Sequence, residues 1–166
     1  METRIFWHKK WHESQYQLFH EEEQRGELSP VAFSSRTMAC LKGNKYLFRP
    51  RKFFCSRVTV LDASTLEQLA EIRFTGNGLN GVLSLEQGEN YRLHCTNPFA
   101  TRWIISFREK EQISYTGNPF RGCIRTRIDN PMLIVTGLYA GILQWRKITL
   151  LIIILIPLTL ILIRTL

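Results

Sequence analysis

The hydrophobic pattern divides the chain into two parts. From residue 3 to residue 129, short runs alternate apolar and polar positions, as where Tyr91 and Leu93 are separated by polar neighbours. A period of two is typical of strands with one buried face. The predicted strands cover residues 4–7, 14–19, 26–33, 37–41, 45–49, 53–62, 67–74, 81–86, 90–95, 102–109, 112–116 and 122–128.

Turn residues separate these runs at regular intervals. The segment 76–81 reads GNGLNG and fits the glycine pattern of a dinucleotide-binding loop. Such a loop must lead into a helix, whereas the residues that follow predict two more strands, so we interpret it as a hairpin turn. Residues 62–74 also have helical spacing, and for them we favour a tight turn over 62–65 followed by a strand.

About a dozen short strands with no long helix among them indicate a sandwich or a barrel. We expect the sheet to close on itself, because an open edge exposes unpaired backbone groups. The predicted fold is therefore mostly β, an antiparallel barrel of about twelve strands with a hydrophobic helix after the last strand.

The C-terminal part is almost wholly apolar. From Ile148 to Ile163, 13 of 16 residues are Leu or Ile. Membrane insertion of such a run is favoured by about 4 to 8 kcal/mol, and as a helix it is about 24 Å long. Its flanks are Trp145, Arg146, Lys147 and Arg164, which suit the membrane interface. We predict a membrane-spanning helix.

A second apolar run, Pro131–Trp145, precedes it and contains Gly137 and Gly141. Its length favours a core helix of the β domain, although a second membrane segment is the alternative. The predicted organisation is a cytosolic β-barrel domain over 1–145, with its core helix at 131–145, and a C-terminal membrane anchor over 146–166. The basic flank before the anchor predicts that the barrel is cytoplasmic, and the N-terminus lacks the apolar stretch of a signal peptide, so we expect a single-pass, tail-anchored protein.

Charge adds a candidate binding surface. The chain has 22 Lys and Arg against 14 Asp and Glu, a net charge of +8, and every acidic residue lies at or before Asp129. Six basic residues fall within 16 positions without one acid, and they are Lys42, Lys45, Arg49, Arg51, Lys52 and Arg57. A basic face on a hairpin could bind anionic lipid headgroups, or could be an ordinary solvated face.

No set of residues predicts catalysis. The four cysteines form no C-x-x-C pair and are expected to be free thiols. His8 and His12, spaced i, i+4, give only a weak signal for zinc, so we expect no metal and no cofactor. No nucleophile elbow, phosphate-binding loop or kinase motif occurs in the chain.

The order of elements resembles the tubby C-terminal-like superfamily, which includes the LURP-one-related proteins and the phospholipid scramblases. The resemblance is carried by the basic hairpin and following strand over 42–74, the strands at 103–107 and 122–125, and the run 129–143. It implies about twelve strands around a central helix, with Gly137 and Gly141 allowing that helix to fit. It also implies phosphoinositide binding as one possibility, whereas the chain lacks the cysteine-rich segment expected of scramblases.

We therefore expect a non-enzymatic membrane protein whose β domain binds anionic lipid, a phosphoinositide or another acidic lipid, or else a protein partner at the membrane surface. Alternatives are a scaffolding subunit without a lipid ligand, or lipid transport or scrambling. Nucleic acid is not expected as a partner.

Overall fold

The computed structural model describes residues 2–51, 56–76 and 79–165, and the side chains of the C-terminal helix through residue 157 and at 159. Twelve strands precede one long helix, α1, at Pro131–Thr165. The strands are β1 Thr3–His8, β2 Tyr16–His20, β3 Glu23–Pro30, β4 Thr37–Leu41, β5 Asn44–Pro50, β6 Arg57–Asp62, β7 Gln68–Phe74, β8 Gly81–Leu85, β9 Asn90–Cys95, β10 Arg102–Phe107, β11 Lys110–Gly117 and β12 Arg121–Thr126.

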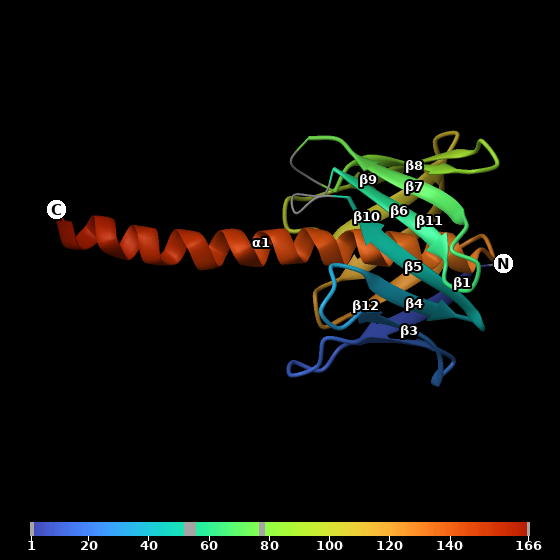
Figure 1. Cartoon of the computed structure of the whole chain (residues 1–166), viewed down its shortest axis with the longest axis horizontal. Coiled ribbons are helices and arrows are strands. Elements are labelled where there is room, and N and C mark those ends of the chain that lie inside the picture. The colour runs from blue at the N-terminus through green and yellow to red at the C-terminus, as the bar shows by residue number, and fades with distance from the viewer. Residues whose placement is uncertain (1, 52–55, 77–78, 166) are drawn as a thin grey trace.

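The strands form a closed antiparallel barrel, as the alternating pattern predicts. Each strand pairs with its neighbours in the sequence, and β1 closes the sheet by pairing with β12, with Ile5 opposite Ile124. α1 enters the barrel and projects far beyond it (Figure 1). The predicted fold class is confirmed, and the two C-terminal apolar runs form a single continuous helix.

Some predicted strands are too long, because their last residues belong to turns. β3 ends at Pro30, whereas the prediction extended to Phe33, and β10 ends at Phe107, because Arg108 and Glu109 adopt positive φ in a two-residue turn. The turn after β6 is confirmed, since the Asp62 carboxylate accepts hydrogen bonds from the Ser64 and Thr65 amides at 2.7 and 3.0 Å. These bonds also lower the pKa of Asp62. β7 follows as a strand.

The first half of α1 fills the barrel. Its apolar side chains, from Leu133 to Ile142, are buried on all sides by inward-facing strand residues. Tyr139 stacks on Phe48 with ring centroids 4.3 Å apart. A small cavity of about 10 Å³ lies beside Thr136. The barrel interior is therefore a packed core.

Two glycines allow this close fit. A Cβ atom at Gly137 would overlap the ring and hydroxyl of Tyr115, and one at Gly141 would overlap the indole of Trp103. The Trp103 Nε1–H donates to the Gly137 carbonyl at 2.9 Å, and the Tyr115 hydroxyl donates to the Ile134 carbonyl at 3.0 Å. The helix and the barrel wall are thus joined by contact and by hydrogen bonds.

The connections between strands divide between the two ends of the barrel. The helix begins at the end that carries loops 21–22, 42–43, 63–67, 86–89 and 108–109, and we call this the start end. It leaves the barrel at the opposite end, the exit end, which carries loops 9–15, 31–36, 96–101 and 118–120 and the described residues between β5 and β6 and between β7 and β8. Asn130 caps the helix at the start end, where its Oδ1 accepts a hydrogen bond from the Leu133 amide at 3.2 Å.

Candidate functional site

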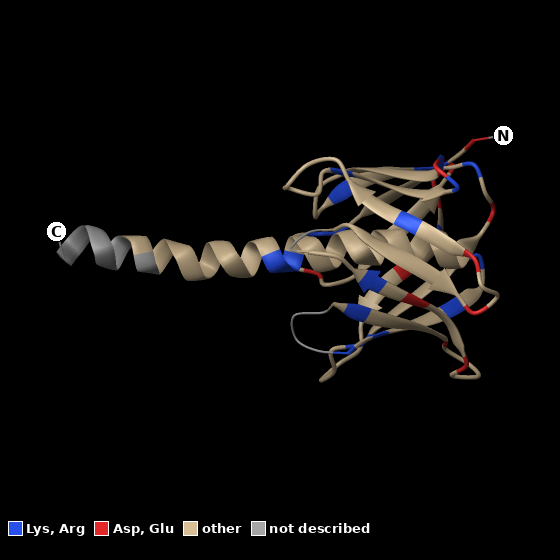
Figure 2. Ribbon diagram, turned by 90° about the horizontal axis from the view of Figure 1, so that it is seen from above, with Lys and Arg blue, Asp and Glu red and all other residues tan. Residues whose placement is uncertain are grey.

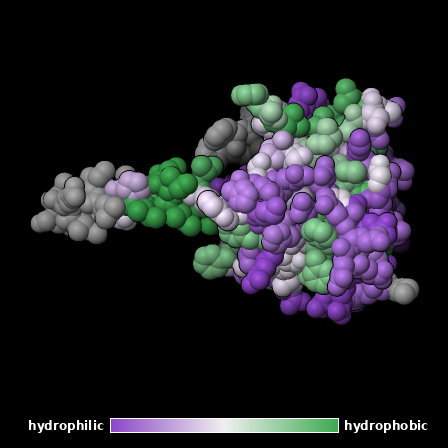
Figure 3. Space-filling model, turned by 90° about the horizontal axis from the view of Figure 1, so that it is seen from below, coloured by the Kyte–Doolittle hydropathy of each residue, from purple (hydrophilic) through white to green (hydrophobic). Residues whose placement is uncertain are grey.

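The second half of α1 is apolar and uncovered. The side chains from Leu150 to Ile156 are each about half exposed or more, and all seven are Leu or Ile. Figure 3 shows this part of the helix as a hydrophobic rod beside a mainly hydrophilic barrel wall. Within the described residues, α1 is long and apolar enough to cross a membrane over Pro131–Pro157, but a third of the apolar 18-residue stretch within this span is buried inside the protein.

Three of the four predicted anchor flanks lie where α1 leaves the barrel. The indole of Trp145 is buried and donates to the Ala100 carbonyl at 3.1 Å. Arg146 is exposed and lies close to Tyr16, and the Lys147 Nζ lies 5.3 Å from the centre of the Phe74 ring. These residues fix the exit point at about Ile148. Arg164 lies in the last turn of α1, and its side chain is outside the described part.

The predicted basic face separates along the hairpin of β5 and β6. Lys42 lies in the turn at the start end, where its Nζ contacts the Asp129 carboxylate at 2.6 Å. Lys45 is exposed near the same end. Arg49, Arg51 and Arg57 are exposed toward the exit end, and the Arg51 amide bonds to the Arg57 carbonyl at 3.1 Å. Lys52 lies outside the described residues.

A fourth arginine completes the group near the exit end. Arg57 pairs with Arg73 across β6 and β7, and Thr59 pairs with Glu71. Glu71 contacts the Arg73 Nε at 2.5 Å, and its pKa is lowered by this hydrogen bond and by the charges of Arg73, Arg51 and Arg57. We call Arg49, Arg51, Arg57 and Arg73 the arginine cluster. Three of its charges act on the Glu71 carboxylate, and Arg49 lies opposite Thr59 on the next strand, β5.

The sequence analysis missed Arg73 and Glu71. They follow the hairpin by a further strand, and only the register between β6 and β7 brings them beside Arg57 and Thr59. The alternation along β7 was a usable signal, because it places Glu71 and Arg73 on the outer face on either side of the buried Ile72.

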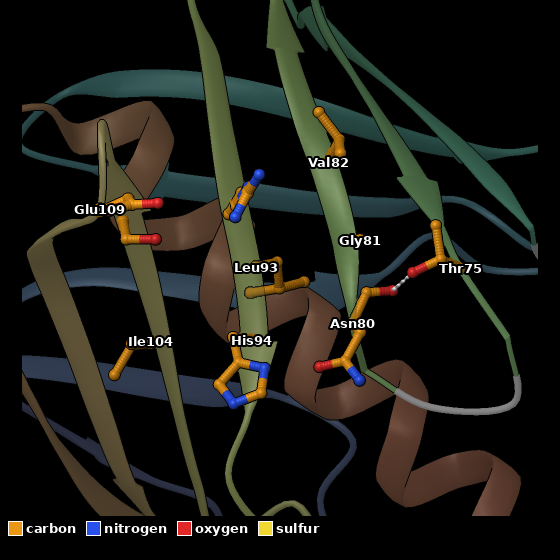
Figure 4. A pocket seen from close by; sticks show the side chains of 10 residues that line it. Thr75, Asn80, Gly81, Val82, Leu93, His94, Ile104 and Glu109 are labelled. Carbon is orange, nitrogen blue, oxygen red and sulfur yellow. Dashed lines mark hydrogen bonds between the residues drawn. The ribbon is translucent and has the colours of Figure 1, made fainter.

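A shallow groove of about 450 Å³ runs along the outer wall over β8, β9 and β10 (Figure 4). Its residues include His94 and Glu109, two residue types that acid–base chemistry uses, together with the cation Arg92. In the close-up, His94 and Glu109 lie apart, and neither side chain forms a hydrogen bond or ion pair with the part of the chain that the structure describes. The groove therefore offers separate polar groups and no aligned pair.

Cys40, Cys95 and Cys123 are free thiols, and Cys55 lies outside the described residues. Burial raises the pKa of Cys123. No group of three metal-ligating side chains gathers within residues 2–51, 56–76 and 79–165.

Comparisons with family models, with curated protein sequences and with solved structures give no match to this chain. Three physical features of the molecule therefore indicate its function. They are the uncovered apolar half of α1, the basic residues Arg146 and Lys147 where α1 leaves the barrel, and the arginine cluster.

Proposed function

We propose that the protein is a membrane-anchored, non-enzymatic protein whose β-barrel lies on the cytoplasmic face and binds anionic lipid headgroups. The observation that carries the proposal is the division of α1 at Ile148. Its first half is buried in the barrel, and its second half exposes Leu and Ile on every side. Seven consecutive exposed Leu and Ile residues are an apolar patch that soluble proteins avoid.

The energies favour the bilayer as the environment of this half. The seven described residues from Leu150 to Ile156 contribute about −2 to −4 kcal/mol on insertion, and the remaining Leu and Ile residues add to this. Arg146 and Lys147 stand directly before the apolar stretch. The excess of basic residues on the barrel side supports a cytoplasmic barrel.

The arginine cluster supports the choice of an anionic lipid. Arg51 and Arg57 lie at the base of their hairpin at the exit end, and the neighbouring Ser56 carbonyl accepts the Phe74 amide at 2.8 Å. Phe74 in turn lies under Lys147. The cluster is thus next to the point where α1 enters the membrane, and arginine forms paired hydrogen bonds with phosphate oxygens.

The resemblance to tubby-like domains agrees with this proposal, since it implies a barrel around a helix and includes phosphoinositide binders. A fold by itself does not show which ligand a protein binds, so the arginine cluster is the stronger support for lipid binding. Transport of lipid through the barrel has no such support, because the buried first half of α1 fills the described interior and the cavity beside Thr136 measures about 10 Å³.

The test uses the full chain in a mild neutral detergent. Short-chain phosphatidylserine and short-chain phosphatidylcholine are titrated separately at low and high salt. We expect tighter binding of the serine lipid and weakening by salt. Arg51→Gln, Arg57→Gln and Arg73→Gln should each reduce its affinity about fivefold, because a basic residue near an anionic surface contributes about 1 kcal/mol.

Glu71→Gln is the matched variant in the same cluster. It removes the carboxylate on which Arg73, Arg51 and Arg57 act, and it should strengthen binding of the serine lipid. Equal affinity for the two lipids, with no response to these variants, would refute lipid binding by the cluster.

A further inference from the structure

Exposed aromatic side chains gather at one end of the barrel. The described residues include five exposed Phe and Trp side chains, and four of them stand on exit-end loops: Trp11, Phe33, Phe99 and Phe120, which are 84%, 111%, 70% and 48% exposed. The fifth, Phe6, lies on the barrel wall. The start-end loops expose only one large hydrophobic side chain within the described residues, Leu66.

Hydrogen bonds hold two of these loops in place. In loop 96–101, the Asn97 side chain bonds to Thr101 through both its amide nitrogen and its oxygen, at 2.6 and 3.0 Å. The same loop receives the Trp145 indole at the Ala100 carbonyl. Phe99 is therefore held at a fixed position beside the base of the projecting helix.

The loop that carries Phe120 is fixed in the same way. The Asn118 Oδ1 accepts hydrogen bonds from the Phe120 and Arg121 amides at 2.9 and 3.1 Å. The Phe120 carbonyl accepts the Lys9 amide at 2.7 Å, which joins this loop to the one that carries Trp11. Hydrogen bonds thus hold the backbone from which these exposed aromatic side chains project.

Phe33 is held at a cost to folding. Its φ of 55° lies in the left-handed region, which is unfavourable by about 1–2 kcal/mol for a residue with a Cβ atom. The Phe33 side chain is fully exposed, so burial within the protein offsets none of this cost. Glycine or asparagine would suit this backbone better, and the presence of a phenylalanine suggests a role outside the folded domain.

The two ends of the barrel also differ in charge, and the acidic residues of the loops lie mainly at the start end. Among the described residues, the exit-end loops contain a single acidic residue, Glu13, whereas the start-end loops, with the segment before α1, contain seven: Glu21, Glu22, Glu67, Glu86, Glu89, Glu109 and Asp129. Basic residues of the exit-end loops outside the arginine cluster include Lys9, Lys10 and Arg36, to which α1 adds Arg146 and Lys147. Figure 2 shows most of the acidic residues away from the projecting helix.

The length of the apolar stretch limits the distance between barrel and bilayer. From Ile148 to Ile163 the helix is about 24 Å long, and the hydrocarbon core is about 30 Å thick. Lys147 and Arg164 bound this stretch. A helix this short spans the core only if the exit end of the barrel reaches the lipid headgroups.

We infer that the exit end of the barrel is a second lipid-contacting surface, which inserts Trp11, Phe33, Phe99 and Phe120 into the interface of the anionic leaflet that α1 enters. The barrel then stands end-on, with the acidic start end toward the cytoplasm. Aromatic side chains are the residues that membrane interfaces favour, and the basic residues between them match anionic headgroups. The inference rests on the proposed anchoring by α1 and is independent of the arginine cluster.

The native Trp11 provides the reporter for a test. The full chain is placed in vesicles of phosphatidylcholine with about 30% phosphatidylserine, an anionic surface. Quenching of tryptophan emission is measured with brominated lipid and with aqueous acrylamide. Trp7, Trp103 and Trp145 are buried, and Trp11→Phe gives their shared background. We expect the Trp11 emission to be quenched by the brominated lipid and protected from acrylamide.

Leu66→Trp in the Trp11→Phe background is the matched control, because residue 66 is exposed at the start end. Its emission should be quenched by acrylamide and not by lipid. Phe33→Gly should weaken the lipid quenching of Trp11 without lowering the melting temperature, because glycine adopts the positive φ at this position freely.

The outcomes separate the two proposals. If alkaline carbonate releases the protein from the vesicles, the proposed anchoring fails. If carbonate leaves the protein bound and Trp11 is as open to acrylamide as the position-66 reporter, the anchoring stands and the end-on surface is refuted. If Trp11 is protected in native membranes but not in the vesicles, a protein covers this end of the barrel. That result would also overturn the inference.

Discussion

Gly137→Ala tests whether α1 is packed in the barrel as closely as the structure shows. The added Cβ would overlap the hydroxyl and ring of Tyr115, which is fully buried and stacked on Trp103 at 5.1 Å between ring centroids. Tyr115 also donates to the carbonyls of Leu133 and Ile134 at 3.2 and 3.0 Å. The ring therefore cannot move aside without losing packing or a hydrogen bond.

The sign of the effect distinguishes this packing from an ordinary helix. Replacing glycine by alanine in an unhindered helix stabilises it by about 1 kcal/mol. Overpacking costs about 1–3 kcal/mol, and a weakened hydrogen bond costs about 1 kcal/mol more. The free energy of unfolding should therefore fall by about 1–3 kcal/mol, which lowers the melting temperature by roughly 3–10 °C for a chain of this size.

The measurement is thermal unfolding of the full chain in mild detergent, followed by tryptophan emission, because Trp7, Trp103 and Trp145 lie in the same core. Tyr115→Phe removes the hydroxyl nearest to the added methyl, so the cost of Gly137→Ala should be smaller in that background. A melting temperature equal to or above that of the wild type would refute the close packing of α1 against β11.

Three further predictions concern the same unfolding transition. Asn130→Ala removes the helix cap and should cost about 1 kcal/mol, whereas Asn130→Ser should retain most of the stability. Thr136→Val replaces a buried hydroxyl without a hydrogen-bond partner and should raise stability by about 1 kcal/mol; a decrease would show that the hydroxyl is paired. Burial raises the pKa of Tyr16 to about 12, against the opposing charge of Arg146. The unfolded chain loses the Tyr16 proton at a lower pH than the folded chain does. Stability is therefore retained below pH 10 and declines between about pH 10 and 12. The melting temperature and tyrosinate absorbance follow this decline. Tyr16→Phe should reduce the decline, and an unchanged profile would contradict this assignment.

Much of the fold could be predicted because its signals are local. Alternation marks each strand, and the Leu- and Ile-rich composition marks α1. The strand ends were harder, because turns such as Glu21–Glu22 and Arg108–Glu109 adopt positive φ without glycine or asparagine. Residues 62–74 carried a helical and a strand pattern together, and pairing with β6 and β8 decides between them.

The candidate site was harder to predict because it depends on register. Lys45 lies near the first residue of β5, and Arg51 follows its last residue. Six extended residues correspond to about 20 Å, so these neighbours in the sequence lie toward different ends of the barrel. Arg73 joins Arg57 only through the pairing of β6 with β7. A run of basic residues in the sequence therefore indicated the hairpin correctly but not which charges lie together.

The two ends of the barrel follow from its connectivity. Strands of five to eight residues span about 17–26 Å, whereas a 35-residue helix is about 52 Å long. A helix that begins after the twelfth strand must therefore emerge at the opposite end, beside the loops that follow the odd-numbered strands. In a closed up-and-down barrel these loops alternate in sequence with those of the other end. Trp11, Phe33, Phe99 and Phe120 all belong to the first set, and seven acidic residues belong to the second. Loops with exposed aromatic residues and loops with acidic residues thus alternate along the chain. This alternation, which no single loop reveals, favours a barrel that stands end-on to the membrane over one that lies on its side.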